Sequence, residues 1–245
     1  RRIKRTLGLS RPNSQVITNI PTTPAPSVET VQDEAATKHQ VLLDAAAEDF
    51  INTAHSSLRL NQVTRCVAMN VSLAIAPDFF AMAVADLENG KISVKQTVGM
   101  RLVGFNVGDV SSAAEAMNDP MSTDEIKLWR GEELVELTNQ SHFAATAVGA
   151  GIRSVLAGNF VDEQDLVAQV RICSANPEAF SSAEVSFLQR ISGHLKSAVI
   201  NARNSESLIE LQRYLVGQNE RFAQMQDGVE GTEAELRLNH ARLTV

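Results

Sequence analysis

Residues 151 to 202 contain two strand-like apolar runs and a helix start, in an order that few folds accommodate. One apolar run follows Gly151, polar residues occupy positions 162–165, and a second apolar run comes after them. Two such runs joined by a short polar segment are expected to pair as a β-hairpin. A long helical pattern comes next, and its apolar side has to be covered. This part of the chain therefore predicts an α/β fold that closes with a hairpin and a helix.

The start of that helix has a specific capping sequence. The Ser181 hydroxyl is placed to accept a hydrogen bond from the first helical turn, and Glu184 can reach back to the N–H of Ser181. Phe180 and Val185 lie on either side of this cap and are placed to pack together as a hydrophobic staple. We therefore expect the helix to begin directly after Ser181.

Two helices are predicted near the start of the chain. Residues 29–58 contain many Ala, Glu, Gln and Leu residues and no proline, which favours a helix. A second helix is expected near residues 60–75, and the break before Pro77 ends it. The apolar face of this second helix is predicted to consist of Val63, Val67, Val71 and Ala74.

A first hairpin is predicted after these helices. Residues 79–85 form an unbroken apolar run and residues 92–98 a second strand-like run, with Asn89-Gly90 between them. Asn-Gly between two such runs is a strong hairpin signal. The lack of alternation in the first run predicts that both faces of that strand are covered.

The segment between the two hairpins is expected to hold one more strand and several short helices. Residues 102–107 are predicted as a third strand, and residues 111–118 as a short helix or loop. The sequence Ser-Thr-Asp-Glu at 122–125 has the pattern of a second capping box and predicts a helix that includes Trp129. Residues 142–148 are predicted as a small Ala-rich helix that glycines stop.

The residues at 151–154 (Gly-Ile-Arg-Ser) and 177–181 (Pro-Glu-Ala-Phe-Ser) carry a resemblance to the GAF domain family, over about residues 50–205. The resemblance implies an α+β fold with a twisted antiparallel sheet of five or six strands. The first and last helices would then pack on one face, and the middle segments would form a pocket on the other. It also implies a ligand-sensing and dimerising module of bacterial signalling proteins, which usually binds or relays rather than catalyses.

Beyond residue 202 the helical pattern changes to heptads. Apolar residues recur at intervals of seven from Leu208 to Leu243, and a second, mixed set lies three residues after each of the first five. This pattern predicts a parallel coiled coil between two copies of the chain. The predicted dimerisation residues, called the heptad row below, are Leu208, Leu211, Leu215, Phe222, Met225 and Val229.

Two features weaken the coiled-coil prediction. Gly217, Gly228 and Gly231 each disfavour a helix interior, and residues 227–231 could form a break or hinge. The apolar face of residues 188–202 also does not continue in phase into Leu208. The alternative is a helix that packs on its own domain.

The charge distribution separates the start of the chain from its body. Residues 1–28 hold five basic and no acidic residues, so with a net charge of −7 the remaining residues carry −12. An acidic body argues against nucleic-acid binding, because phosphate neutralisation needs a basic face. The Pro-, Ser- and Thr-rich composition of residues 1–28 predicts a flexible tail or linker. Basic segments are also common directly after a membrane helix on its cytoplasmic side, so we expect a cytoplasmic region, tethered to a membrane in one interpretation.

These patterns divide the chain into four predicted parts: a basic tail (1–28), an N-terminal helix (29–49), a GAF-like sensory domain (50–203) and a coiled-coil helix (204–245). The five histidines show no metal-ligand spacing, so no metal site is predicted. No feature of the sequence identifies a cofactor or ligand.

Three residues of the predicted domain have more than one interpretation. His142 is either a surface or capping residue or a ligand contact, and Trp129 either packs in the core or lines a pocket. Arg153 is either exposed on an alternating strand or an anion partner in the pocket.

The preferred hypothesis is a non-catalytic sensory and dimerisation region of a larger signal-transduction protein. One alternative is an assembly or docking subunit whose pocket has degenerated. Another is a thiol-dependent enzyme, which needs Cys66 or Cys173 to be exposed and of low pKa. The GAF relatives that hold a bilin or reduce methionine sulfoxide do so through cysteines, and neither cysteine matches those arrangements.

Overall fold

The structure is a computed structural model that describes residues 28–54, 59–86, 88–123 and 125–243, with the side chains at 28–35, 227–230, 238 and 241–243 left out. The predicted tail at 1–28 therefore lies outside the described residues, apart from its last position. The chain divides into two units, 1–37 and 38–245, and the sheet and its hydrophobic cores belong to the second unit. None of the described helices combines the length and the apolar character needed to cross a membrane.

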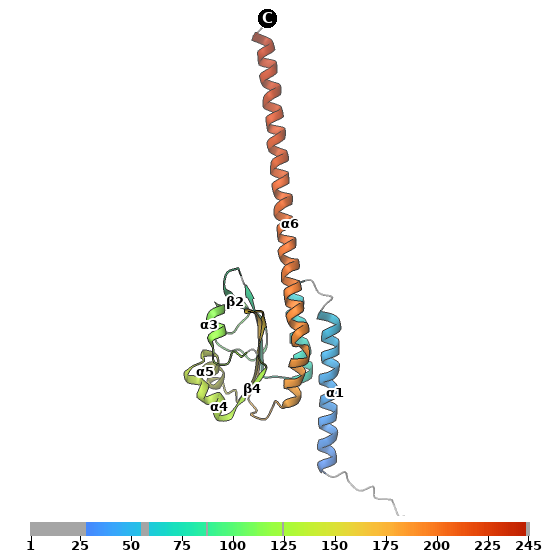
Figure 1. Cartoon of the computed structure of the whole chain (residues 1–245), viewed down its shortest axis with the longest axis vertical. Helices are drawn as coiled ribbons and strands as arrows, with labels where there is room; N and C mark the ends of the chain where they lie inside the picture. Colours follow the sequence, from blue (N-terminus) through green and yellow to red (C-terminus); the bar gives the residue numbers. More distant parts are fainter. Residues whose placement is uncertain (1–27, 55–58, 87, 124, 244–245) are drawn as a thin grey trace, which may run out of the picture. The chain divides into compact units, whose positions relative to one another are not determined.

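A six-stranded antiparallel sheet forms the centre of the fold (Figure 1). The strands lie in the order β3-β2-β1-β6-β5-β4, so the two hairpins meet at the central pair β1 and β6. Their bounds are β1 Phe79–Asp86, β2 Lys91–Gly99, β3 Val110–Ser112, β4 Lys127–Arg130, β5 Ser154–Asp162 and β6 Asp165–Ser174.

Helices cover both faces of this sheet. They are α1 Val28–Ala54, α2 Leu60–Ile75, α3 Ala113–Asn118, α4 Gly131–Glu136, α5 His142–Gly149 and α6 Ser182–Leu243, with a 3₁₀ turn at Leu137–Asn139. Figure 1 shows α3, α4 and α5 on one side of the sheet and α6 on the other. Side chains of α1, α2 and α6 share one core with Phe80, Met82 and Val84 of β1, and α4 and α5 share a second core with the opposite face. The predicted α+β architecture, an antiparallel sheet of five or six strands with helices on both faces, is confirmed.

Both predicted hairpins are confirmed. β1 pairs with β2 through a turn in which Gly90 has φ +60°, a conformation that glycine adopts without strain. β5 pairs with β6 across residues 162–165, where Glu163 has φ +54°. Both strands of each hairpin are buried on at least one face, so register and hydrophobic pattern agree.

The two predicted helix boundaries are confirmed as well. α2 spans Leu60–Ile75 with its four predicted apolar residues buried. At the start of α6, the Ser181 hydroxyl accepts a hydrogen bond from the N–H of Ala183, and a Glu184 carboxylate oxygen accepts one from the N–H of Ser181 at 2.6 Å. The other oxygen of this buried carboxylate contacts His39 of α1. The capping box therefore also connects two helices of the same face.

The predicted third strand at 102–107 is wrong. Gly104 and Gly108 have φ of +80° and +95°, so the chain turns here instead of extending. The third strand is β3, which comes after these turns and pairs with the outer edge of β2. Sequence patterning placed the strand too early because Leu102 and Val107 are apolar, although Val107 is exposed.

The helix predicted from the second capping box is also wrong. Residues 127–130, including Trp129, form the edge strand β4, which pairs with β5. The Ser122 hydroxyl donates to the carbonyl of Ala116 instead of capping a helix. Pairing with an available sheet edge satisfies several backbone groups at once, and here it outweighs a local capping signal.

The long C-terminal helix contains no break among its described residues. α6 runs for 62 residues, and its backbone stays helical through Gly217, Gly228 and Gly231, so the expected interruption at 227–231 is wrong. Its apolar residues up to Ala202 are buried against the sheet. After Ala202 no described side chain of α6 is buried.

Candidate functional site

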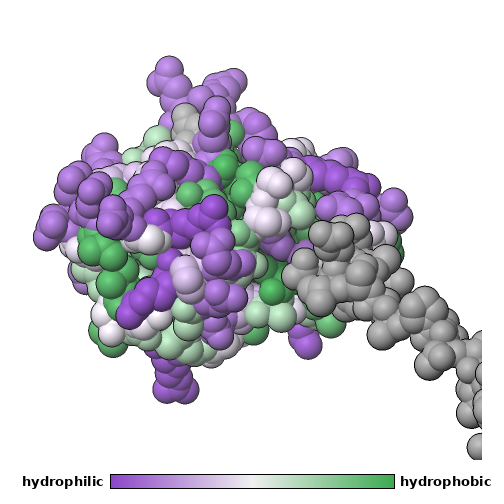
Figure 2. Space-filling view, turned by 90° about the horizontal axis from the view of Figure 1, so that it is seen from below, coloured by the Kyte–Doolittle hydropathy of each residue, from purple (hydrophilic) through white to green (hydrophobic). Residues whose placement is uncertain are grey.

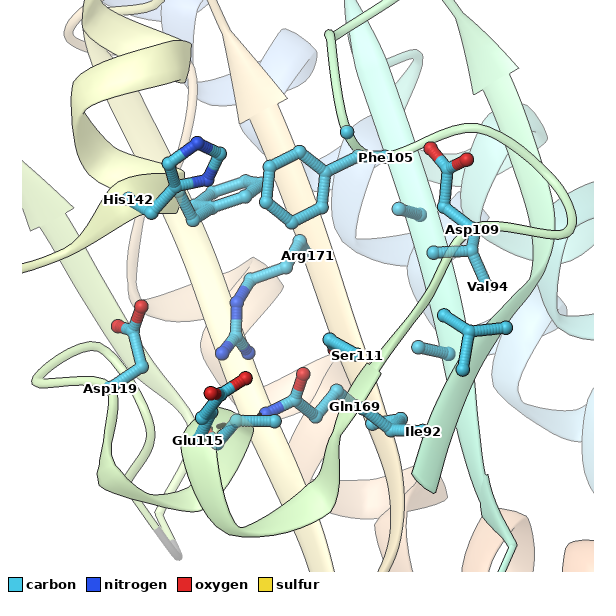
Figure 3. Close-up of a pocket in the computed structure, with 16 residues that line it drawn as sticks. Ile92, Val94, Phe105, Asp109, Ser111, Glu115, Asp119, His142, Gln169 and Arg171 are labelled. Atoms are coloured by element: carbon cyan, nitrogen blue, oxygen red, sulfur yellow. Dashed lines mark hydrogen bonds between the residues drawn. The ribbon is translucent and has the colours of Figure 1, made fainter.

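A pocket of about 350 Å³ lies on the face of the sheet opposite α6 (Figure 3). Its floor comes from β1, β2 and β6, and its walls come from the segment 104–111 and from α3 and α5. The residues that line it are Ala81, Ala83, Ile92, Val94, Gly104, Phe105, Asp109, Val110, Ser111, Glu115, Ala116, Asp119, His142, Phe143, Gln169 and Arg171.

Small side chains on the central strand create this space. Residues on a strand alternate between faces, so Ala81 and Ala83 face the pocket whereas Phe80 and Met82 face the helical core. Two alanines leave the sheet uncovered where larger residues would fill the gap. The pocket is therefore a direct consequence of the pattern Phe-Phe-Ala-Met-Ala in β1.

Arg171 of β6 is the main charged group inside the pocket. Its side chain is only 7% exposed. Its guanidinium donates to three neutral acceptors: Nη1 to the carbonyl of Val170 at 3.2 Å and to Asn159 Oδ1 at 3.5 Å, and Nη2 to Ser122 Oγ at 3.2 Å. Among the described residues no carboxylate lies within ion-pair distance of this group. The pocket thus contains a buried cation without a contacting anion.

Burial is the main influence on the charge state of Arg171. Desolvation lowers the pKa of the guanidinium, and the nearby Asp119 carboxylate acts in the opposite direction. Arginine stays protonated even when its pKa falls, because its starting value lies so far above neutrality. The ring of Phe143 lies 5.8 Å from the guanidinium carbon and adds a weak cation–π contact.

Three carboxylates also line the pocket, but two of them already accept hydrogen bonds from the protein. Asp119 accepts from the N–H of Met121 and from the Ser141 hydroxyl, both at 2.8 Å. Asp109 accepts from the N–H of Asn106 at 2.6 Å. The third, Glu115, is an exposed residue of α3.

Gln169 lies two residues before Arg171 and therefore on the same face of β6. Its amide nitrogen donates to the carbonyl of Ala116 and to Ser122 Oγ, both at 3.2 Å. Ser122 thus contacts both polar residues that β6 contributes to the pocket. These bonds connect the floor of the pocket to the segment that carries α3.

The structure places the three residues that had more than one interpretation. His142 is the first residue of α5 and lines the pocket, with its ring 6.0 Å from that of Phe105. Trp129 packs in the core beneath Lys127, outside the pocket, and its buried indole N–H has no hydrogen-bond partner within the part of the chain that the structure describes. Arg153 is exposed and donates to the carbonyl of Val148, so it is not a pocket residue.

Sequence reasoning missed Arg171, the residue that defines this pocket. The apolar run that contains it predicts only a buried strand. The signal was nevertheless present, because Gln169 and Arg171 are polar residues two positions apart in an otherwise apolar run. That spacing places both on one face, where a polar function is expected.

Neither cysteine has the properties of a reactive thiol. Burial, with a smaller contribution from Asp49, raises the pKa of Cys66. Burial also strongly raises the pKa of Cys173, which is inaccessible. The described residues contain no group of three or more metal-ligating side chains.

The heptad row lies on the part of α6 beyond the sheet. The side chains of Leu208, Leu211, Leu215, Phe222 and Met225 are all exposed in the single chain, whereas the side chain of Val229 lies outside those described. Such a row of large apolar residues is unusual on a helix surface. By contrast, Figure 2 shows the opposite end of the molecule, where apolar residues form separate small areas among hydrophilic ones.

Several solved structures are similar to this fold. The GAF domain of an Acinetobacter phosphoenolpyruvate-protein phosphotransferase matches 65% of this chain and 93% of its own, with 15% identity and a TM-score of 0.53. Free methionine-R-sulfoxide reductase from Neisseria meningitidis, solved with its substrate, matches 68% and 93%, with 8% identity and a TM-score of 0.53. The phycoerythrobilin-bound GAF domain of a cyanobacterial phytochrome matches 67% and 97%, with 11% identity and a TM-score of 0.50.

Sequence comparison adds little to these structural similarities. The sequence matches no protein-family model. Transcription elongation factor GreA from Christiangramia forsetii is 34% identical over 76 residues, which are 31% of this chain and 44% of that protein. The chain therefore matches less than half of the length of this curated relative. The sheet, the flanking helices and the three solved structures together show that the chain has a GAF-like fold.

Proposed function

We propose that this chain is a non-catalytic sensory region that binds a small ligand in the pocket and relays the binding event through α6. The observation that carries the proposal is the position of β6 between the pocket and that helix. One face of β6 presents Gln169 and Arg171 to the pocket. The other face places Val170 and Ile172 in the core that contains α6.

This arrangement provides a physical route for a signal. A ligand that contacts Arg171 acts on β6. Val170 and Ile172, the residues on either side of Arg171, lie on the opposite face of this strand in the core that contains α6. β6 also leads into α6 through the short segment 175–181, which ends in the capping box. Close-packed cores transmit small displacements because they have few voids to absorb them.

The exposed heptad row supports dimerisation as the output of this relay. Two parallel copies of α6 would bury these side chains against each other, as in a coiled coil. A shift or rotation of α6 within the domain would then change the packing or register of the pair. The homodimer is accordingly part of the proposal, and nucleic acid is not a partner because the body of the chain is acidic.

Thiol catalysis is the less favoured alternative. Burial raises the pKa of both Cys66 and Cys173, whereas a nucleophilic cysteine needs a lowered pKa and access to substrate. The described residues of the pocket contain no cysteine. The docking subunit with a degenerate pocket is tested directly by the experiment below.

The test is a thermal-shift screen of the purified chain against a mixed collection of amino acids, nucleotides, sugars, amines and organic acids. A true ligand raises the melting temperature by mass action. Ala83→Leu fills the pocket and is expected to abolish the shift, whereas Ala114→Leu, on an exposed position of α3 outside the pocket, should retain it. A flat response across the collection, or a shift that Ala83→Leu leaves intact, would refute ligand sensing in this pocket and favour the docking subunit.

A further inference from the structure

We infer that the ligand of this pocket is a small organic monocarboxylate, whose carboxylate contacts Arg171 and whose apolar body lies over β1 and β2. This inference rests on the proposed function, because it names the chemical class of the ligand in that same pocket. Two features of the pocket support it: the buried guanidinium of Arg171, and a floor of apolar side chains from β1 and β2.

The protein itself compensates the buried charge of Arg171 only weakly. A buried charge is costly unless an opposite charge or several strong hydrogen bonds compensate it. The acceptors given by the protein are two amide or peptide oxygens and one hydroxyl, and two of the three distances are 3.2 Å and one is 3.5 Å. Charge-assisted bonds are normally shorter, at about 2.7–2.9 Å. An anion in the pocket would supply the missing compensation.

The charged side chains that line the pocket limit the charge of the ligand. One guanidinium faces a pocket that also contains Asp109, Glu115 and Asp119. A ligand with two or more negative charges, such as a phosphorylated compound, would be repelled by these carboxylates after pairing with the single cation. A cationic ligand would leave Arg171 without an ionic partner. A monoanion is the charge state that this set of residues accommodates.

The volume and the apolar lining of the pocket limit the size and polarity of the ligand. The volume of about 350 Å³ corresponds to roughly a dozen water molecules at about 30 Å³ each, so the ligand is small. Ala81, Ala83, Ile92 and Val94 line the floor, and these apolar side chains favour a hydrocarbon body. Carboxylates match the planar guanidinium because the two groups can form parallel hydrogen bonds.

The close-up view shows how the two ends of the pocket differ. In Figure 3 the guanidinium of Arg171 is directed toward Glu115 and Gln169, and the rings of Phe105 and His142 lie toward the other end of its side chain. Ile92 and Val94 lie on the far side of the pocket, on β2, which β1 separates from β6. The carboxylate is therefore placed at the end with Gln169, and the ligand body extends across the apolar strands.

The experiment compares matched acids and amides. The probes are aliphatic and aromatic monocarboxylates of about four to ten carbons, with their 2-hydroxy derivatives, each paired with its neutral primary amide. Thermal shift identifies binders, and calorimetric titration measures their dissociation constants. We expect at least one acid to bind the wild-type chain about 10- to 100-fold more tightly than its amide, as for a lost hydrogen bond to a charged group.

Two variants assign this preference to Arg171. Arg171→Met should weaken binding of the acid by about the same factor and leave binding of the amide unchanged, which also reports that the pocket is intact. Arg153→Met removes an exposed arginine outside the pocket and should change neither value. Raised salt should weaken acid binding to wild type only modestly, because the pair is buried.

Two results would overturn the inference and differ in what they mean for the proposed function. Equal binding of acids and amides, or tighter binding of phosphorylated compounds in the wider collection, would refute the monocarboxylate while ligand sensing in this pocket stands. Absence of a shift with every acid in the panel would also refute it. If the wider collection is flat as well, the proposed function fails together with it.

Discussion

Replacing Leu215 and Phe222 with aspartate tests whether the heptad row holds two copies of the chain together. In the single chain these side chains are 52% and 63% exposed, so a partner helix would bury about half of each. Full burial of such a side chain contributes about 1.5–3 kcal/mol, so each gains on average about 0.8–1.7 kcal/mol on pairing. The four side chains of a dimer would then contribute about 3–7 kcal/mol. That range corresponds to roughly two to five orders of magnitude in the dissociation constant.

The aspartates add a further penalty, because four carboxylates would lie close together in a buried seam. We expect Leu215→Asp/Phe222→Asp to be monomeric at micromolar concentration in sedimentation equilibrium or light scattering, while the wild type is dimeric. The matched control is Ala223→Asp/Gln224→Asp, which adds the same charge at exposed positions outside the row and should leave the dimer intact.

Melting of the double variant checks the other part of the reasoning. The core that contains α6 ends at Ala202, so the sheet and its helices should still unfold cooperatively. A variant that remains dimeric would show that other surfaces, such as α1 and α2, hold the copies together. A variant that fails to fold would show that the helix beyond Ala202 belongs to the domain core. A monomeric wild type at the same concentration would refute the coiled coil itself.

Three further predictions concern the domain itself. Burial alone would raise the pKa of Glu184, but hydrogen bonds from the cap and from α1 lower it. The ionised carboxylate therefore stabilises the fold above the ordinary carboxyl range, and this stabilisation is lost as pH falls through the lowered pKa. Glu184→Gln should cost about 1–2 kcal/mol of unfolding free energy at pH 7 in urea, and the difference from wild type should disappear in acid. Gly99→Ala should destabilise the domain by more than about 2 kcal/mol, because φ is +88° and the new Cβ would lie 2.1 Å from the carbonyl oxygen of Asp78. Gly90→Ala is the control, because Gly90 also has a positive φ but open space around it, and it should cost about 1–2 kcal/mol in the same urea assay. Cys173 is buried with a raised pKa, so it should react with a thiol reagent only after unfolding, and rapid labelling of the native chain would contradict the packing of β6.

Part of the fold could be predicted because its causes lie within a few residues of one another. The turn at Asn89-Gly90 depends on glycine's access to positive φ, and the start of α6 depends on Ser181 and Glu184, three positions apart. The buried face of α2 follows from the helical spacing of its valines. The GAF-like resemblance supplied the number of strands and the face on which the pocket lies, and the structure confirms both.

The wrong helix prediction at Trp129 and the failure to predict Arg171 both involve contacts between segments that are far apart in the sequence. Trp129 and its neighbours became a strand because the edge of β5 was free to pair, which no local signal at 122–125 reports. Arg171 became the central residue of the pocket because Ala81 leaves space beside it and α3 approaches from more than fifty positions away. Short-range hydrogen bonds and side-chain periodicity depend on residues that are close in the sequence. The sequence by itself therefore determined the two hairpins, the cap of α6 and the buried face of α2. Burial and strand pairing depend on which segments come together, so only the tertiary structure decided the edge strand, the pocket and its buried cation.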